Sequence, residues 1–212
     1  MRLLVTGSNR GIGAHLVAEA RAQGHEVLGL TRPGRGGELE ADVTDHAALH
    51  ALAVNAGPLD GLVNNAGIIG PARQSTLDMD FEGFRETLEV NTLAPLAVAQ
   101  AFLPNLRAGH RARIVSISSQ MAWMGYRKSD RIAYRASKVA LNKLMQGLAT
   151  DLAPEGIAVA VVDPGWVRTD MGGSEAEDDP RFVARGVLDI VTNLTMEDTG
   201  RFLHFTGEER AY

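Results

Sequence analysis

Tyr134 and Lys138 are the two residues whose types and spacing most directly suggest chemistry. They lie four residues apart in the helix-forming stretch AYRASKVALNKL, residues 133–144, so both side chains project from one face of a helix. A free tyrosine has a pKa of about 10, and an ammonium about 6 Å away at an effective dielectric of about 20 favours the phenolate by about 2 pKa units. We therefore expect Lys138 to make Tyr134 acidic enough to exchange a proton with a substrate. The alternative is a surface pair in which the ring packs on the lysine stem.

A glycine-rich octet near the N-terminus, TGSNRGIG at residues 6–13, is typical of a phosphate-binding turn. It joins an apolar run to a helical pattern, and at such a junction an anion meets free N–H groups and the positive end of a helix. The spacing is not G-x-G-x-x-G, so a turn without a ligand is the alternative. The residues expected to contact a cofactor here are Gly7, Ser8, Asn9, Arg10, Gly11, Ile12 and Gly13.

The second apolar run, EVLGL, is followed by Thr31 and Arg32 rather than by an acid. A site that prefers NAD(H) presents Asp or Glu to the adenosine ribose at this point. Arg32, together with Arg10, can instead pair with a 2′-phosphate through charge-assisted hydrogen bonds. We therefore predict NADP(H) in preference to NAD(H), the alternative being that Arg32 is an ordinary exposed arginine.

The hydropathy pattern predicts the fold that positions these residues. Short apolar runs alternate with helical stripes, as in parallel strands that are joined by helices and covered on both faces. We expect an α/β doubly wound parallel sheet, a Rossmann fold, as one three-layer domain over residues 1–212 that holds both the cofactor and the catalytic site. The expected strands are RLLV, EVLGL, GLVNN, ARIVSIS, GIAVAVV and RFLHF; the expected helices are a first one ending near Gly24, one over 84–106 with a kink or break at Pro95, and one over 133–153.

Composition excludes several classes of function. The 212 residues include no cysteine, which rules out disulfides and thiolate chemistry, and the net charge is −5. Broad binding to nucleic acid or anionic membranes needs clustered Lys and Arg, so neither is expected. No run of about 18 apolar residues could span a membrane, and the first strand begins too early for a leader peptide. We therefore expect a cytoplasmic location.

Five motifs appear in the order that is found in the short-chain dehydrogenase/reductase family, which this sequence resembles. They are TGSNRGIG, NNAG at 64–67, SISS at 116–119, YRASK at 134–138 and DPGWVRTDMGG at 163–173. Within the family, YRASKVALN and PGWVRTDMGG are most similar to the branch of small carbonyl reductases related to C-factor and sniffer. The resemblance implies that Tyr134 is the general acid and base, Lys138 its partner and Ser119 the hydroxyl that orients a carbonyl. It also implies that Asn91 holds a proton-relay water, although a structural helix asparagine is the alternative.

The resemblance implies further contacts with the cofactor along the edge of the sheet. Asp42 and Val43 occupy the family's adenine position, although DVTD at 42–45 would serve equally well as a helix cap. Asn64 is expected to tie strands together. No metal is expected, because His46 and His50 lie one turn apart without a further ligand. The remaining expected cofactor residues are Asn65, Ala66, Gly67, Pro164, Gly165, Val167 and Thr169.

Three segments depart from the usual family pattern. The loop between Ser119 and Tyr134 is slightly long, and its Trp123, Met124 and Tyr126 could line an apolar substrate pocket, with Trp166 and Met171 opposite. The segment RPGRGGELEA at 32–41 is too short for a helical crossover. The acidic run EAEDDP at 175–180 is interpreted as a solvated loop. No long lid follows Met171, which favours an open pocket and broad specificity.

Together these patterns predict an NADPH-dependent oxidoreductase. We expect hydride transfer between the nicotinamide and a carbonyl or alcohol substrate, namely small or medium ketones, aldehydes or quinones. The family further implies a homodimer or homotetramer. The alternative is a signalling or regulatory protein that senses NADP(H) with the same fold and turns over little or nothing.

Overall fold

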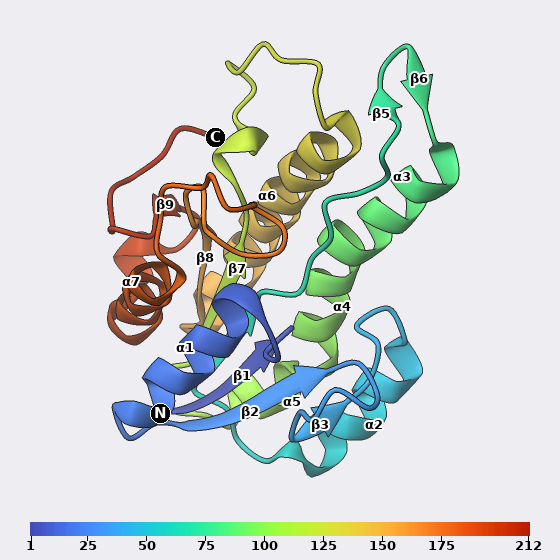
Figure 1. Cartoon of the computed structure of the whole chain (residues 1–212). Helices are drawn as coiled ribbons and strands as arrows, with labels where there is room; N and C mark the ends of the chain where they lie inside the picture. The colour runs from blue at the N-terminus through green and yellow to red at the C-terminus, as the bar shows by residue number, and fades with distance from the viewer.

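The computed structural model describes all residues 1–212 and places a seven-stranded sheet between two layers of helices (Figure 1). The strand order is β3-β2-β1-β4-β7-β8-β9, and every neighbouring pair is parallel. The predicted doubly wound parallel sheet is therefore confirmed. The strands are β1 (Arg2–Thr6), β2 (Glu26–Thr31), β3 (Leu39–Glu40), β4 (Gly61–Asn64), β7 (Arg113–Ile117), β8 (Ala158–Asp163) and β9 (Phe202–His204).

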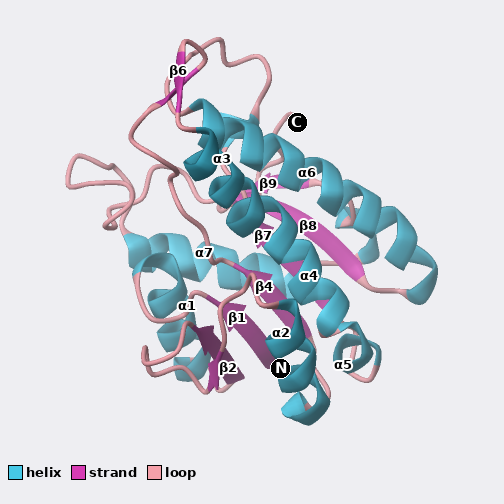
Figure 2. Ribbon diagram, turned by 90° about the vertical axis from the view of Figure 1, so that its right-hand side faces the viewer, coloured by secondary structure: helices cyan, strands magenta, loops and turns pink.

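Helices cover both faces of the sheet, as the nearly continuous apolar strands require. Two of them, α1 (Gly11–Ala22) and α7 (Pro180–Asn193), pack side by side on one face. Figure 2 shows α2 (His46–Ala56), α4 (Ala94–Ala101) and α6 (Ile132–Leu152) in front of the other face. The shorter elements are α3 (Phe81–Leu88), α5 (Leu103–Arg107) and the hairpin strands β5 (Gln74–Ser75) and β6 (Asp78–Met79).

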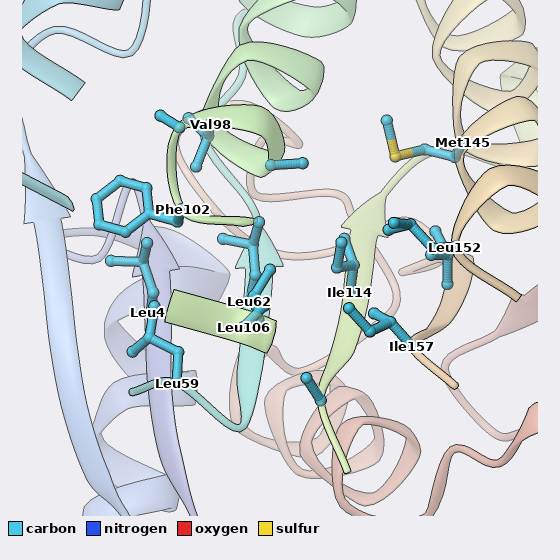
Figure 3. Packing of buried hydrophobic residues seen from close by; sticks show 14 of the residues in the cluster. Leu4, Leu59, Leu62, Val98, Phe102, Leu106, Ile114, Met145, Leu152 and Ile157 are labelled. Carbon is cyan, nitrogen blue, oxygen red and sulfur yellow. The ribbon is translucent and has the colours of Figure 1, made fainter. Parts of the chain in front are cut away.

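The hydrophobic core consists of two clusters, one on each face of the sheet. Figure 3 shows the first, in which Leu4, Leu62 and Ile114 of the strands pack with Phe102, between α4 and α5, and Met145 of α6. Neighbouring strand residues such as Leu3 and Val5 belong to the second cluster, under α1 and α7. Because side chains alternate along a strand, every strand of the sheet except the short edge strand β3 supplies both clusters.

The order of the strands reverses between β1 and β4. The chain leaves β1 for β2 on one side and leaves β4 for β7 on the other. In an open parallel sheet, ligands bind in the crevice outside the carboxyl ends of the strands at such a switch point. The glycine turn after β1 and the NNAG motif after β4 both lie at this edge.

The long helix expected over residues 84–106 is interrupted, as the proline indicated. It comprises α3, a π-helical turn at Glu89–Leu93, α4 and α5. Pro95 lies in the first turn of α4, directly after the π-helical turn. The predicted short connection over 32–41 is also confirmed, because it contains only a loop and the two-residue β3.

The interpretation of residues 175–180 as a solvated loop is wrong for its second half. The Asp178 carboxylate accepts from the backbone N–H of Trp166 at 2.9 Å, and its own N–H donates to the Trp166 carbonyl at 2.9 Å. Asp179 caps α7 by accepting from the N–H of Arg181. The sequence does not distinguish acidic side chains that accept hydrogen bonds from backbone N–H groups from acidic side chains that are only solvated, which explains the wrong interpretation.

No helix combines the length and the apolar composition that crossing a lipid bilayer would require.

Candidate active site

The turn at residues 6–13 places bare backbone at the N-terminus of α1. Arg10 is the N-cap residue and makes no side-chain cap hydrogen bond, so the first N–H groups of the helix have no intrahelical or capping partner. Gly7 and Gly11 have φ of 65° and 53°, which favours glycine. A Cβ at Gly13 would collide with the carbonyl oxygen of Gly7. The turn is therefore a concave set of donors, as an anionic ligand requires.

The NNAG motif lies directly against this turn. The Asn65 amide donates to the carbonyls of Thr6 and Gly7 at 2.9 and 3.1 Å, and the Thr6 hydroxyl accepts from the N–H groups of Asn65 and Ala66, both at 3.0 Å. A Cβ at Gly7 would lie 2.9 Å from the Ala66 Cα. The ends of β1 and β4 are thus fastened to each other. Asn64 instead binds the Pro95 carbonyl and the Ser116 hydroxyl, which is a structural role.

The residues expected around the adenosine end lie at the surface beside β2. Arg32 is exposed, and its guanidinium makes no ion pair or hydrogen bond. Arg10 is 3.6 Å from the Asp170 carboxylate in a largely exposed pair, which holds it only weakly. Both cations are therefore available to a phosphate.

Asp42 and Val43 lie between this surface and α2. One Asp42 oxygen accepts from the Thr44 N–H and hydroxyl at 3.0 and 2.8 Å. The cap of α2 is Asp45, which accepts from the Ala48 N–H, so the capping role in DVTD belongs to its last residue. Val43 packs against the first core cluster. The second Asp42 oxygen accepts no hydrogen bond from the chain.

The structure brings Tyr134, Lys138 and Ser119 together near the carboxyl ends of β7 and β8. All three are buried, with 9%, 5% and 8% of their surface exposed. The Lys138 ammonium lies 5.7 Å from the centroid of the Tyr134 ring and donates to the Ile117 carbonyl at 2.8 Å. The Ser119 hydroxyl acts on the phenol in the direction that lowers its pKa. These contacts are inconsistent with a surface pair.

The expectation that Lys138 makes the phenol acidic is wrong for the protein without cofactor. Burial raises the pKa of Tyr134 to about 12, the negative charge of Asp163 acts in the same direction, and the hydrogen bond with Ser119 opposes them. Burial also lowers the pKa of Lys138 to about 8. Spacing along a helix gives the distance between the two groups, whereas desolvation of both groups dominates their pKa values. Tyr134 is therefore a protonated phenol near neutral pH, ready to act as an acid.

Asn91 lies in the π-helical turn and is fully buried. Its amide exchanges two hydrogen bonds with the backbone of Ile68, both of 2.8 Å, and donates to the Ser137 hydroxyl at 3.0 Å. Pro95 lacks the N–H that would otherwise reach the Asn91 carbonyl four residues back. A Cβ at Gly67 would lie 3.2 Å from the Asn91 amide oxygen and 3.8 Å from the Lys138 nitrogen. Asn91, Gly67 and Lys138 are thus neighbours.

The other serines of SISS lie in the core. Ser116 is fully buried and contacts the Met145 sulfur, and Ser118 donates to the Asn142 side chain at 2.5 Å. Both contacts are structural. The Ser119 hydroxyl accepts from the Met121 N–H at 3.1 Å and begins a short 3-10 turn.

The segment after β8 faces the glycine turn. The Thr169 side chain lies against Gly11, since a Cβ there would be 3.4 Å from the Thr169 methyl carbon. Val167 is buried and forms an isolated bridge with Asp178. Gly165 has a φ of 75°, which lets the chain turn sharply after Pro164. This segment therefore closes the crevice opposite the NNAG motif.

Gln74 is a residue at the site that the sequence did not indicate. It lies in the β5–β6 hairpin, and its side-chain oxygen accepts from the Tyr134 backbone N–H at 3.2 Å. Its amide nitrogen donates to the carbonyls of Ile69 and Pro71 at 3.1 and 2.7 Å. Because the N-cap residue Arg131 has no side-chain cap bond, Gln74 supplies the missing acceptor. No local motif marks an acceptor that is supplied from sixty residues away.

The candidate substrate residues are exposed around this crevice. Trp123, Met124 and Tyr126 are 45%, 75% and 39% exposed, and Trp166 and Met171 are 46% and 39% exposed. The Tyr126 ring is held by the Lys128 ammonium and the Arg135 guanidinium, each 5.2 Å from its centroid. No group of three or more His, Asp or Glu side chains is placed to hold a metal ion.

Comparison with known proteins identifies relatives over most of the chain. The short chain dehydrogenase family matches residues 2–180. The C-signal of Myxococcus xanthus is 38% identical over 164 residues, which are 76% of this chain and 98% of that protein.

Two solved structures share the complete fold. The NADPH-bound carbonyl reductase from chicken fatty liver superimposes with a TM-score of 0.90 at 29% identity, covering 100% of this chain and 98% of that one. The carbonyl reductase Sniffer of D. melanogaster gives a TM-score of 0.91 at 28% identity, covering 100% and 99% of the two chains.

Proposed function

The chain belongs to the short-chain dehydrogenase family and is therefore an oxidoreductase by descent, and on this premise we propose that it is an NADPH-dependent carbonyl reductase. One observation carries the proposal: the buried Tyr134, Lys138 and Ser119 lie at the carboxyl edge of the sheet that also holds the uncapped glycine turn. Residues 1–212 act in this proposal as one domain, which assembles into a homodimer or homotetramer. The carbonyl reductases that share its fold support the substrate class.

The residues of the crevice fit a dinucleotide. A Cβ at Gly13 would fill the turn and collide with Gly7, so the turn keeps the room and the free N–H groups that a pyrophosphate needs. Asn65, Ala66 and Gly67 line its path past β4, and Pro164, Gly165, Val167 and Thr169 would hold the nicotinamide end. Bound NADPH would supply the hydride, and its oxidised form a positive charge.

Side chains of the protein donate the proton to the substrate and orient its carbonyl group. The Ser119 hydroxyl donates a hydrogen bond to the carbonyl oxygen of the substrate and stabilises its developing negative charge. Tyr134, protonated because burial raises its pKa to about 12, donates its phenolic proton to the same oxygen. The Lys138 ammonium stabilises the phenolate that is left, and Asn91 holds the water that returns a proton.

The function predicts NADPH oxidation that depends on an added carbonyl compound. Purified protein is mixed with NADPH and a panel of aldehydes, ketones and quinones, and absorbance of the reduced nicotinamide is followed. We expect turnover of several members, because the pocket residues are exposed and no long lid closes over them. Tight binding of NADPH without turnover of any member would refute the proposal.

Replacement of Arg32 tests the preference for NADPH. Arg32→Ala is expected to weaken NADPH binding about 10- to 100-fold, the value of one charge-assisted hydrogen bond, and to leave NADH binding unchanged. Arg35→Ala removes an equally exposed charge from the same loop and should change neither affinity. Fluorescence titration with both nucleotides measures the effect. Equal losses for NADPH and NADH in Arg32→Ala would show that this arginine does not read the 2′-phosphate.

A signalling role is the second candidate, and the name of the C-signal supports considering it. A protein that only senses NADP(H) has no need of a buried phenol and ammonium, and burying polar groups costs free energy. The complete set of side chains therefore favours catalysis.

A further inference from the structure

Asp163 is a buried acid that the proposed chemistry leaves without a role. It is the last residue of β8, directly precedes Pro164 and Gly165, and is 0% exposed. A buried carboxylate is strongly unfavourable unless it is paired and hydrogen-bonded. Its partners therefore indicate what the residue contributes.

One carboxylate oxygen of Asp163 joins two loops of the site. Its Oδ1 accepts from the N–H of Gln120 at 3.0 Å and from the N–H of Gly165 at 3.1 Å. Gln120 directly follows Ser119, and Gly165 belongs to the segment proposed to hold the nicotinamide. A single acceptor thus fixes the carbonyl-orienting hydroxyl relative to the cofactor segment.

The other oxygen, Oδ2, faces an arginine from the last residues of the chain. The Arg210 Nε lies 3.4 Å from it. Neither atom makes a hydrogen bond, although both atoms are buried. The two charges therefore interact as an ion pair, and the His204 imidazole of β9, the neighbour of Asp163 in the sheet, lies near both.

The C-terminal segment that carries Arg210 is fastened along β9. The Arg210 N–H donates to the Phe202 carbonyl at 2.7 Å, and Glu209 forms a bridge with Leu203. The Tyr212 hydroxyl donates to the Gly200 carbonyl at 2.6 Å. These bonds hold the guanidinium over the carboxyl edge of the sheet.

The charge of Asp163 also acts on Tyr134. The charged groups that face the phenol are Lys138 on α6, Arg131 just before α6, and Asp163 on β8. Asp163 opposes ionisation of the phenol and Arg131 favours it. Arg210 pairs with Asp163 and offsets part of its negative charge.

We propose that Asp163 is a positioning residue for the reaction: its carboxylate, paired with Arg210, holds the Ser119 loop and the Pro164–Gly165 segment in a fixed relative position, and its negative charge acts on the Tyr134 phenol. The inference rests on the proposed function for its kinetic consequences. Its structural part, the link between two loops, does not depend on turnover.

Opposite charge changes give opposite kinetic signatures. Reduction needs a protonated Tyr134, so its rate falls as the pH rises through the pKa of the phenol. We call this fall in rate at high pH the alkaline limb of the pH profile. Asp163→Asn removes a negative charge and should move the alkaline limb to lower pH. The same variant should reduce kcat and the affinity for NADPH about 10-fold each. Arg210→Gln leaves the carboxylate unbalanced and should move the limb to higher pH. A residue that acted only on folding would not shift the limb in two directions.

A second measurement uses the protein without nucleotide. Amide hydrogen exchange, followed by NMR, should become faster at Gln120 and Gly165 in Asp163→Asn, because the shared acceptor is weakened. Arg201→Gln is the matched control, since Arg201 lies near the same segment but pairs with Asp198 and Glu209 at the surface. It should leave exchange, affinity and pH profile as in the wild type.

The outcomes separate this inference from the proposed function. The inference is overturned if amide hydrogen exchange at Gln120 and Gly165 is unchanged in Asp163→Asn. It is also overturned if the alkaline limb of the pH profile shifts in the same direction in Asp163→Asn and Arg210→Gln. If Asp163→Asn does not fold, the direction of the shift in Arg210→Gln decides. If the wild type reduces no carbonyl compound, the proposed function fails, and exchange and NADPH affinity still decide the role of Asp163.

Discussion

Tyr134→Phe is expected to lower kcat for carbonyl reduction about 10³-fold, because the variant has no proton to give to the substrate oxygen. The ring, its packing and the helix remain, and the only group lost is the phenolic hydroxyl beside Ser119. NADPH should therefore bind with nearly unchanged affinity. Steady-state rates with a saturating aldehyde, together with a fluorescence titration of NADPH, measure both quantities.

Tyr126→Phe is the matched control for this substitution. Tyr126 lies in the loop before α6, with Lys128 and Arg135 each 5.2 Å from its ring centroid. Phe keeps the ring, which is a candidate substrate contact, and removes only a hydroxyl that has no role in the proposed chemistry. This variant should retain its rate within a factor of about two, since most surface changes have small effects. A Tyr134→Phe enzyme with more than a tenth of the wild-type rate would remove Tyr134 from the mechanism.

Lys138→Met is expected to lower activity and yet to stabilise the fold. The ammonium lies 5.7 Å from the centre of the Tyr134 ring. Burial determines the pKa of the resting phenol, but at an effective dielectric of about 20 a charge at this distance stabilises the phenolate that forms during proton transfer about 100-fold. Its loss should therefore lower kcat about 100-fold. Rates at saturating NADPH and carbonyl substrate measure this loss.

The stability change follows from the pKa of Lys138. Burial lowers this pKa to about 8 from 10.5, so between these pH values the unfolded chain binds more protons and wild-type stability rises with pH. Below pH 8 the charged form costs about 3 kcal/mol, of which the hydrogen bond to Ile117 returns about 1 kcal/mol. Without nucleotide, the free energy of unfolding of Lys138→Met should therefore exceed that of the wild type by about 2 kcal/mol at pH 7, and by less at pH 9.5.

Lys143→Met provides the comparison for both effects, because Lys143 is exposed on the same helix. It should change neither the rate nor the pH dependence of urea unfolding. A Lys138→Met variant with a lower free energy of unfolding than the wild type at pH 7 would show that the buried ammonium does not destabilise the fold.

The features that the sequence predicted well are those with local signals. The strands, the turn at 6–13 and the break before Pro95 depend on hydropathy, glycine and proline, each of which acts on its own neighbours. The helix at 180–193 carried equally local signals that were not recognised. They are the cap Asp179, Pro180 in the first turn and a stripe of Val183, Val187 and Val191.

The features that could not be predicted depend on contacts between distant segments. The spacing of Tyr134 and Lys138 gives their separation but not their burial, and burial reversed the expected pKa shift of the phenol. Gln74 reaches Tyr134, and Arg210 reaches Asp163, only because the fold brings a hairpin and the chain end to the site. Sequence spacing carries no information on such pairs.

Transfer of a labelled hydride tests the central claim most directly. NADPH deuterated at the transferred position of its nicotinamide is incubated with the protein and an aldehyde, and the alcohol is analysed by mass spectrometry. If Tyr134 protonates the oxygen while the carbon receives hydride, the wild type gives an alcohol with one deuterium on its carbinol carbon, and Tyr134→Phe gives almost none. Binding of the labelled NADPH without any deuterated alcohol from the wild type would contradict the account.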